Sequence, residues 1–240
     1  MAGHSKWANI KHRKGRADLA KGKIFSRITK EIITAVKLGG VDTKTNSRLR
    51  TALQKAREVN MPNENIERNI KKASSADQGA FSEVIYELYG HGGVGLIVEV
   101  MTDNKNRSAS DIRIALNKRG GTQANPRAVL FNFDHKGVIQ VLKKSVVEED
   151  LFLAVTEAGA DDFEGEEDIF IITTAPELLF QVKEAIEKLG VKAESSELEW
   201  IPKSWIECAP ETQKANLELI EWLEELEDVD AVYHNMKVQE

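Results

Sequence analysis

The residue types best suited to chemistry are at the start of the chain, where lysines and arginines surround one aromatic side chain. Residues 1–30 contain nine basic residues and one acidic residue, Asp18. Trp7 lies among these cations, so its ring can stack on a base while its neighbours contact phosphates. We therefore expect a nucleic-acid-binding surface made of Lys6, Trp7, Lys11, His12, Arg13, Lys14, Arg16, Lys21, Lys23, Arg48 and Arg57.

Positive charge is concentrated in the first third of the chain. Residues 1–75 hold eighteen basic and six acidic residues, a net charge of +12. The other 165 residues hold fifteen basic and thirty-three acidic residues, a net charge of −18, which gives −6 overall. A basic segment attracts polyanions, and nucleic acid is the commonest polyanion in a cytoplasm. The alternative is a solubilising tail, with Trp7 packed on the helices behind it.

A glycine-rich segment at residues 90–95 (GHGGVG) matches the pattern G-x-G-x-x-G. The dinucleotide-binding fingerprint places a helix directly after these glycines, so that the helix N-terminus meets the pyrophosphate. Here the apolar segment 96–101 follows, which is typical of a strand. The glycines therefore predict a hairpin turn between two strands and no cofactor site.

Acidic residues between Asp161 and Asp168 are the other candidate for chemistry, because carboxylates bind Mg²⁺ and Ca²⁺. Their spacing does not match an EF-hand loop, and residues 164–168 predict a solvated turn between strands. No histidine stands in a metal-ligand motif, and the single cysteine, Cys208, has no adjacent histidine. We predict no enzymatic activity, no cofactor, no metal and no small-molecule substrate. An enzyme that uses the acidic residues is the rival hypothesis.

Length and composition favour a cytoplasmic protein. The 240 residues allow one to three domains, and no apolar run approaches the ~20 residues that span a bilayer. The basic N-terminus lacks the apolar core of a secretion signal. It resembles a mitochondrial targeting segment in composition, but Gly3, Gly15 and Gly22 disfavour a long amphipathic helix there. We expect no membrane partner.

Residues 21–75 have the pattern of a small helical unit. Apolar residues recur every three or four positions from Phe25 to Val36, which predicts a helix that ends at Gly39–Gly40. Asn46 or Ser47 can cap a second helix. Pro62 separates this helix from a short third one, and the three together predict a compact helical domain.

Residues 82–133 change to strands with one helix. Alternating apolar residues predict strands at 84–88, 96–101 and 129–133. A capping box at residues 108–111 opens a helix that Gly120–Gly121 closes. The result is an incomplete ββαβ set.

Residues 138–200 follow the order βαββαβ, which is the ferredoxin-like order. Capping boxes that begin at Ser145 and Thr174 predict the starts of its two helices. A last helix from Pro210 and a strand at 229–236 need a sheet to join, and they can complete the set at 82–133.

The expected fold class is therefore α+β: a small N-terminal helical domain followed by two ferredoxin-like α/β domains, one of them discontinuous. The expected division is a basic arm at 1–20, a helical domain at 21–78, a discontinuous α/β domain at 79–133 plus 206–240, and a ferredoxin-like βαββαβ domain at 134–205.

The first fourteen residues, MAGHSKWANIKHRK, closely resemble the signature of the YebC/PmpR family. The resemblance spans essentially the whole chain. It continues through residues 23–26 (KIFS), 60–62 (NMP), 86–87 (YE), 90–93 (GHGG) and 102–107 (TDNKNR). It implies three domains, a helical one followed by two ferredoxin-like ones.

The resemblance implies a probable DNA-binding transcriptional regulatory protein. Mitochondrial relatives are translational activators, and bacterial relatives are linked to ribosomes stalled on proline-rich nascent chains. The leading hypothesis is thus a DNA-binding transcription regulator. The alternative is a translation factor that contacts ribosomal RNA, with the ribosome as partner and with the glycine turn at 90–95 or the loop at 104–107 reaching a functional centre. Neither role implies a reaction or a cofactor.

Overall fold

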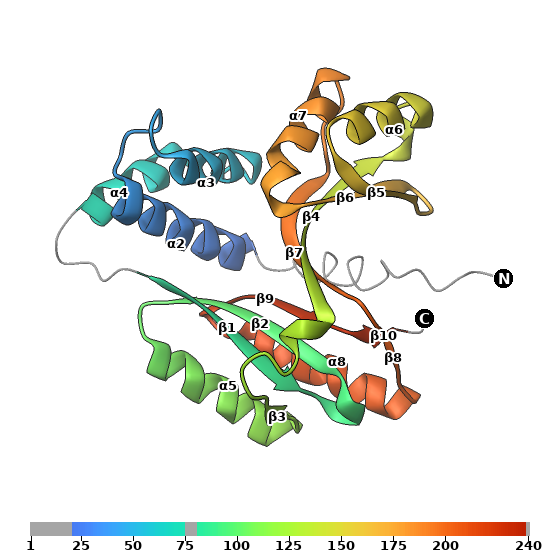
Figure 1. Ribbon diagram of the computed structural model, residues 1–240. Coiled ribbons are helices and arrows are strands. Elements are labelled where there is room, and N and C mark those ends of the chain that lie inside the picture. The colour runs from blue at the N-terminus through green and yellow to red at the C-terminus, as the bar shows by residue number, and fades with distance from the viewer. Residues whose placement is uncertain (1–20, 75–80, 239–240) are drawn as a thin grey trace.

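The computed structural model describes residues 21–74 and 81–238, with helices first and two antiparallel sheets after them. Figure 1 shows the helices as one lobe, beside two lobes in which helices pack on a sheet. The mixed helix-and-sheet fold class expected from the sequence is confirmed. The predicted sites at residues 1–20 lie outside the described residues, as does most of the predicted linker after Ser74.

Three helices form the first lobe because each has one apolar stripe. They are α2 (Lys21–Gly39), α3 (Ser47–Glu58) and α4 (Asn63–Ser74). Ile32 and Leu49 are fully buried in their common core. The Asn46 side chain accepts a hydrogen bond of 3.0 Å from the Leu49 amide, which confirms the predicted cap of α3.

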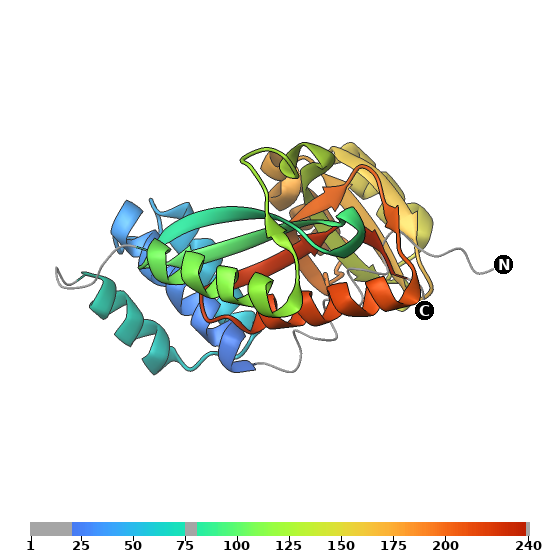
Figure 2. The same ribbon diagram turned by 90° about the horizontal axis from the view of Figure 1, so that it is seen from below.

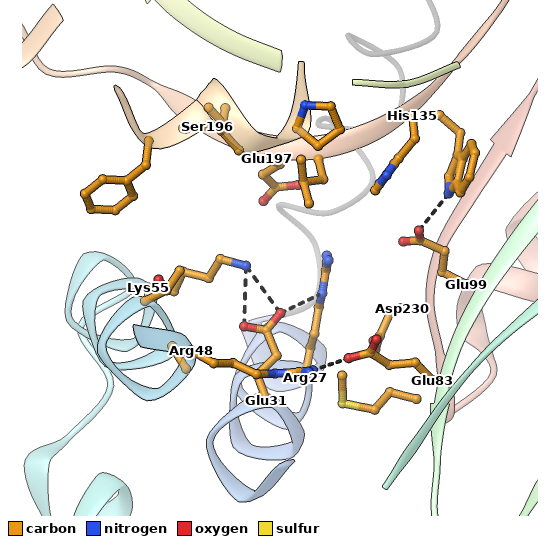
Figure 3. Close-up of a pocket in the computed structure, with 18 of the residues that line it drawn as sticks. Arg27, Glu31, Arg48, Lys55, Glu83, Glu99, His135, Ser196, Glu197 and Asp230 are labelled. Carbon is orange, nitrogen blue, oxygen red and sulfur yellow. Dashed lines mark hydrogen bonds and ion pairs between the residues drawn. The ribbon is translucent and has the colours of Figure 1, made fainter. Parts of the chain in front are cut away.

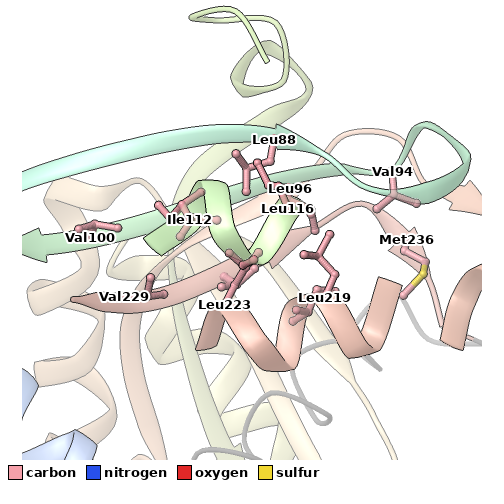
Figure 4. Close-up of a cluster of buried hydrophobic side chains, with 14 of the residues drawn as sticks. Leu88, Val94, Leu96, Val100, Ile112, Leu116, Leu219, Leu223, Val229 and Met236 are labelled. Carbon is pink, nitrogen blue, oxygen red and sulfur yellow. The ribbon is translucent and has the colours of Figure 1, made fainter. Parts of the chain in front are cut away.

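The first sheet has the order β3-β1-β2-β9 and is antiparallel throughout. One face is covered by two helices, as Figure 2 shows. Leu88 and Leu96 from the sheet pack there with Leu219 and Leu223 (Figure 4). Its elements are β1 (Ser82–Tyr89), β2 (Gly95–Thr102), α5 (Lys105–Arg119), β3 (Thr122–Gln123), α8 (Pro210–Glu225) and β9 (Val229–His234).

The second sheet has the order β5-β6-β4-β7, which is the ferredoxin-like arrangement. Two helices pack on it around a core that includes Ile139, Leu151, Ile172 and Ile186. Its elements are β4 (Phe133–Leu142), α6 (Glu148–Glu157), β5 (Ala160–Gly165), β6 (Ile169–Thr174), α7 (Leu179–Lys188) and β7 (Ser195–Pro202). A small parallel pair, β8 (Ile206–Glu207) with β10 (Met236–Lys237), lies outside both sheets.

The strands of the two sheets are arranged in the same spatial order, but they follow one another in a different order along the chain. Strands β2, β3, β1 and β9 of the first sheet occupy the places of β4, β5, β6 and β7 in the second. Helix α5 follows β2 as α6 follows β4, and α8 precedes β9 as α7 precedes β7. The first sheet thus has the ferredoxin-like spatial order, but β1 comes first in the chain instead of directly after β3, and the sheet is completed only when the chain returns after residue 206.

The predicted strand at 129–133 is wrong. Residues Leu130–Asn132 form a short 3-10 turn, and the strand begins at Phe133. The cause is the carboxylate of Glu87, which accepts hydrogen bonds of 2.7 Å from the amides of Val129 and Leu130. Burial alone would raise the pKa of Glu87, but these backbone hydrogen bonds lower it. The chain therefore wraps around a carboxylate instead of pairing as a strand.

The three predicted capping boxes are also wrong. Helix α5 begins at Lys105, with Asn104 as its cap, and not near Ser108. Helices α6 and α7 have no side-chain cap. The hydroxyls of Ser145 and Thr174 donate instead to the carbonyls of Leu142 and Gly159. Because short hydroxyl side chains can bond many nearby carbonyls, the capping pattern alone does not determine their partners.

Candidate nucleic-acid interface and the cleft beside it

Most of the predicted nucleic-acid-binding residues lie outside the described part of the chain. They are Lys6, Trp7, Lys11, His12, Arg13, Lys14 and Arg16. Lys21 opens α2, and only its backbone is described. The predicted residues whose side chains are described are Lys23, Arg48 and Arg57.

Lys23 faces carboxylates. It is half-buried near the start of α2, and burial lowers the pKa of its ammonium group. Glu224 and Asp230 oppose this shift, because their negative charges favour the charged lysine. Lys23 therefore lies in an acidic environment that the α/β lobes supply.

Arg48 and Arg57 lie on opposite sides of α3, since nine residues correspond to two and a half turns. Arg48 forms an ion pair with Glu83 on β1. Arg57 is exposed near the end of the helix. The three described candidates therefore do not converge on one surface.

A cleft of about 770 Å³ separates the three lobes. Its walls come from α2 and α3, from the face of the first sheet opposite α5 and α8, and from α7 and β7. Ile85, Phe180 and Leu198 line it and are 44%, 54% and 41% exposed. Its size and partly apolar lining are within the range of ligand-binding sites, which are common at domain junctions.

Charged groups meet at the end of the cleft beside α2 (Figure 3). Glu31 accepts hydrogen bonds of 3.3 and 3.4 Å from Lys55 and lies 3.7 Å from the Nε atom of Arg27. Burial alone would lower the pKa of Arg27, but Glu197, Asp230 and Glu31 together raise it. Arg27 thus remains charged among carboxylates from three parts of the chain.

Asp230 is a carboxyl group of this region whose pKa is raised well above its ordinary value. Burial raises the pKa of its carboxyl group to about 6, although Arg27 and Lys30 oppose the shift. The nearby carboxylates Glu31 and Glu99 raise it further, because like charges disfavour ionisation. The carboxyl group of Asp230 therefore changes its protonation state near pH 6.

Lys30 holds α2 on the first sheet, a role that the sequence did not reveal. Its ammonium group donates to the carbonyls of Met101 and Glu227 at 3.0 and 2.8 Å and lies 3.4 Å from Asp228. The side chains of Lys30 and Asp228 are only 8% and 5% exposed. A lysine within an apolar helical stripe was the only available signal, and it does not identify a partner 198 positions away.

Asp228 also joins the first sheet to α5. It accepts hydrogen bonds from Arg107 at 2.8 Å, Ser108 at 2.8 Å and Thr102 at 2.9 Å. Burial alone would raise its pKa, but these hydrogen bonds lower it. The segment 104–107, expected as a reaching loop, is therefore tied down at the start of a helix.

The remaining candidates for chemistry are the glycines at 90–95, the acidic residues from Asp161 to Asp168, and Cys208. The glycines at 90–95 form a turn between the antiparallel strands β1 and β2, so the predicted hairpin is confirmed. Asp161 pairs with Lys136 at 2.7 Å. Across residues 21–74 and 81–238, no three His, Cys, Asp or Glu side chains are grouped to hold a metal ion. Burial raises the pKa of the Cys208 thiol.

Of the helices described, none combines the length and apolar character that crossing a bilayer requires.

Two family models match the chain in succession. Residues 5–76 match the TACO1/YebC protein N-terminal domain, and residues 81–236 match the TACO1/YebC second and third domain. A probable transcriptional regulatory protein of Protochlamydia amoebophila (strain UWE25) is 70% identical over 240 residues, which cover 100% of this chain and 98% of that one. One of Chlamydia pneumoniae is 59% identical over 237 residues, covering 98% and 100%. The crystal structure of a conserved hypothetical protein from Aquifex aeolicus aligns with a TM-score of 0.86 at 44% identity, covering 98% of each chain.

Proposed function

Because the chain belongs to the TACO1/YebC family, we propose that it is a nucleic-acid-binding regulator without enzymatic activity, acting on DNA as a cytoplasmic transcription regulator. The names of its relatives, probable transcriptional regulatory proteins, support a regulatory role. The basic arm and the helical lobe supply the phosphate contacts, and Trp7 stacks on or wedges between bases. The α/β lobes position this basic part. We also propose the domain limits given by the sequence, with the second domain discontinuous.

The observation that carries this proposal is the separation of charge along the chain. The first 75 residues have a net charge of +12 and the rest −18. Within the helical lobe, exposed cations are spread over α3, α4 and the loop before α3; they include Lys44, Arg50, Arg57, Arg68 and Lys71. Such charge attracts a polyanion even where no single site is formed.

Charge reversal in the arm tests the proposal. We expect replacement of Lys11, Arg13, Lys14 and Arg16 with Glu to abolish binding to a labelled DNA duplex, measured by fluorescence anisotropy. For the unaltered protein, six phosphate contacts would give a slope of about −5 in log affinity against log salt. The control reverses four exposed lysines of the α/β lobes, Lys118, Lys144, Lys188 and Lys192.

Retained binding in the arm variant, or an affinity that salt does not change, would contradict the proposal. The alternative role, translation through ribosomal RNA, is tested in cells. Crosslinking followed by sequencing of bound DNA and RNA together distinguishes promoter fragments from ribosomal RNA. Recovery of ribosomal RNA alone would replace the transcription role with the translation role.

A further inference from the structure

The loop between β3 and β4, residues 124–132, carries an exposed cation and an exposed ring. In Figure 2 this stretch of chain stands out from the first sheet. Phe131 is 70% exposed, more than any other phenylalanine in the described part of the chain. Arg127, four residues before it, is exposed as well. An aromatic ring and a cation close together are the side chains that bind a base together with its phosphate.

One buried carboxylate fixes the backbone of this loop. Glu87 is only 9% exposed and accepts three backbone hydrogen bonds. The donors are the amide of Arg127 at 2.5 Å and the amides of Val129 and Leu130 at 2.7 Å each. A loop held in this way loses little conformational entropy when it binds, so its contacts contribute more fully to affinity. The loop is thus preorganised for a ligand.

The backbone at Arg127 is strained. Its φ of +66° lies in the left-handed region, which glycine adopts readily and other residues do not. Its guanidinium group makes no hydrogen bond or ion pair with residues 21–74 or 81–238. Its charge attracts the Glu87 carboxylate, but three amides already hold that group. Strain of this kind clusters at binding sites, and the contacts of this side chain within the described fold do not account for it.

The charge around the loop is positive, unlike that of the rest of the α/β part. Residues 112–133 form the longest acid-free run after residue 75 and contain four basic residues, although the chain after residue 75 has a net charge of −18. Lys203 adds a cation near the ring, since its ammonium group donates to the carbonyl of Phe131 at 3.1 Å. Lys203 also pairs with Asp134 at 3.1 Å, so Arg127 is the better candidate for a phosphate contact.

We propose that residues 124–132 form a binding site for an unpaired base and its phosphate. Phe131 stacks on the base, and Arg127 pairs with the phosphate. The inference rests on the proposed function for the class of ligand, and it adds a contact outside the basic arm. Opened DNA and single-stranded RNA both present this chemistry, and the probes below distinguish them. An interface with another protein is the competing use of an exposed ring.

Removing the ring tests the stack. Phe131→Ala is compared with Leu153→Ala, which removes an apolar side chain of α6 that is 60% exposed. The probes are a short single-stranded DNA, a single-stranded RNA of equal length and the matching DNA duplex, each labelled for fluorescence anisotropy. We expect affinity for one or both single strands to fall about five- to hundredfold, which corresponds to one stacked base. The duplex should lose little, because its bases are already stacked on one another.

Arg127→Gly tests the phosphate contact and separates it from a structural role. Glycine adopts a φ of +66° without strain, so we expect the urea midpoint to stay the same or to rise. Affinity for the single strands should fall, and the slope of log affinity against log salt should be shallower by about 0.7. The control, Lys144→Gln, removes one exposed cation that follows β4. A purely structural arginine predicts the reverse, a lower midpoint with an unchanged slope.

The outcomes separate this inference from the proposed function. Binding by Phe131→Ala that matches the Leu153→Ala control would overturn the loop site and leave a protein interface as the use of the ring. If the charge-reversed arm variant loses binding while both loop variants keep it, the loop inference alone fails. If the unaltered protein binds none of the three probes, the proposed function fails, and the loop site fails with it.

Discussion

Asp228 and Asp230 lie two residues apart at the start of β9, yet their carboxyl groups respond to burial in opposite ways. Hydrogen bonds from Arg107, Ser108 and Thr102 outweigh the burial of Asp228 and lower its pKa. Burial raises the pKa of Asp230 to about 6, even though Arg27 and Lys30 attract its charge. Both carboxylates have cations of α2 nearby, so proximity to a cation does not explain the difference.

The difference lies in directed hydrogen bonds. Asp228 has donors between 2.8 and 2.9 Å in addition to the ammonium group of Lys30 at 3.4 Å. A carboxylate with several donors recovers the solvation that burial removes, whereas attraction across a gap recovers only part of it. Asp228 is thus the fixed point of the junction between α2 and the first sheet. The carboxyl group of Asp230, by contrast, changes its protonation state near pH 6.

The largest expected effect comes from removing the fixed point. Asp228→Ala leaves Lys30 buried without its counter-ion and removes one acceptor from each of Arg107, Ser108 and Thr102. Breaking a buried ion pair in this way costs about 3–5 kcal/mol of unfolding free energy. Urea denaturation followed by circular dichroism measures the loss.

Asp103→Ala is the matched control, because Asp103 pairs with the same Arg107 but is 48% exposed. An exposed ion pair of this kind contributes about 0.2–1 kcal/mol. Equal losses in the two variants would show that Asp228 is not the fixed point of the junction.

Lys30→Met should have the next largest effect, about 3 kcal/mol, because it leaves the carbonyls of Met101 and Glu227 without this donor. Combining it with Asp228→Ala should cost less than the sum of the two single losses. A double-mutant cycle measured by urea denaturation gives the coupling, and we expect at least 1 kcal/mol. Strict additivity would mean that the two residues act separately.

Local patterns predicted the helices and most strands because their determinants are close in sequence. The apolar stripe of α2 and the Asn46 cap of α3 need only neighbours within a few residues. Ser108 shows where this fails, since its hydroxyl donates to Asp228, 120 positions away. Glu87 likewise bends residues 127–130 around its carboxylate, and no pattern in either segment indicates this.

The position of the basic residues along the chain could be predicted from the sequence, but the contacts that they make in the folded protein could not. Counting residues locates the basic part of the chain. It does not show that Lys23 faces Glu224 and Asp230, since those partners lie about two hundred positions later. Long-range pairing depends on the return of the chain through α8 and β9, which periodicity made plausible without giving the contacts.

The pH dependence of stability separates the two aspartates. The folded-state pKa of Asp230, about 6, is above its ordinary value of 3.8, so the folded protein holds this proton more tightly than the unfolded chain. Its contribution is present at low pH and lost as pH rises through 6. A shift of this size corresponds to roughly 3 kcal/mol, which partial solvent contact reduces to about 1–2 kcal/mol.

Asp228 has the opposite sign, because its lowered pKa gives a contribution that is lost as pH falls below its ordinary range near 4. We expect Asp230→Asn to flatten the change in stability between pH 5 and about 7.5, measured by urea denaturation at each pH. The groups around Asp230, namely Arg27, Lys30, Glu31 and Glu99, stay unaltered in this variant. An unchanged pH profile would mean that another group titrates there.

The smallest effect is expected at a second ion pair between the helical lobe and the first sheet, that of Arg48 with Glu83. Both side chains are exposed, 41% and 60%, so water solvates each charge after the partner is removed. Arg48→Gln should therefore cost no more than about 0.5 kcal/mol by urea denaturation, and less at high salt. A loss as large as that of Lys30→Met would mean that the two lobes are held by charge attraction in general. The expected result places most of the electrostatic hold between the two lobes in the buried, hydrogen-bonded pair of Lys30 and Asp228.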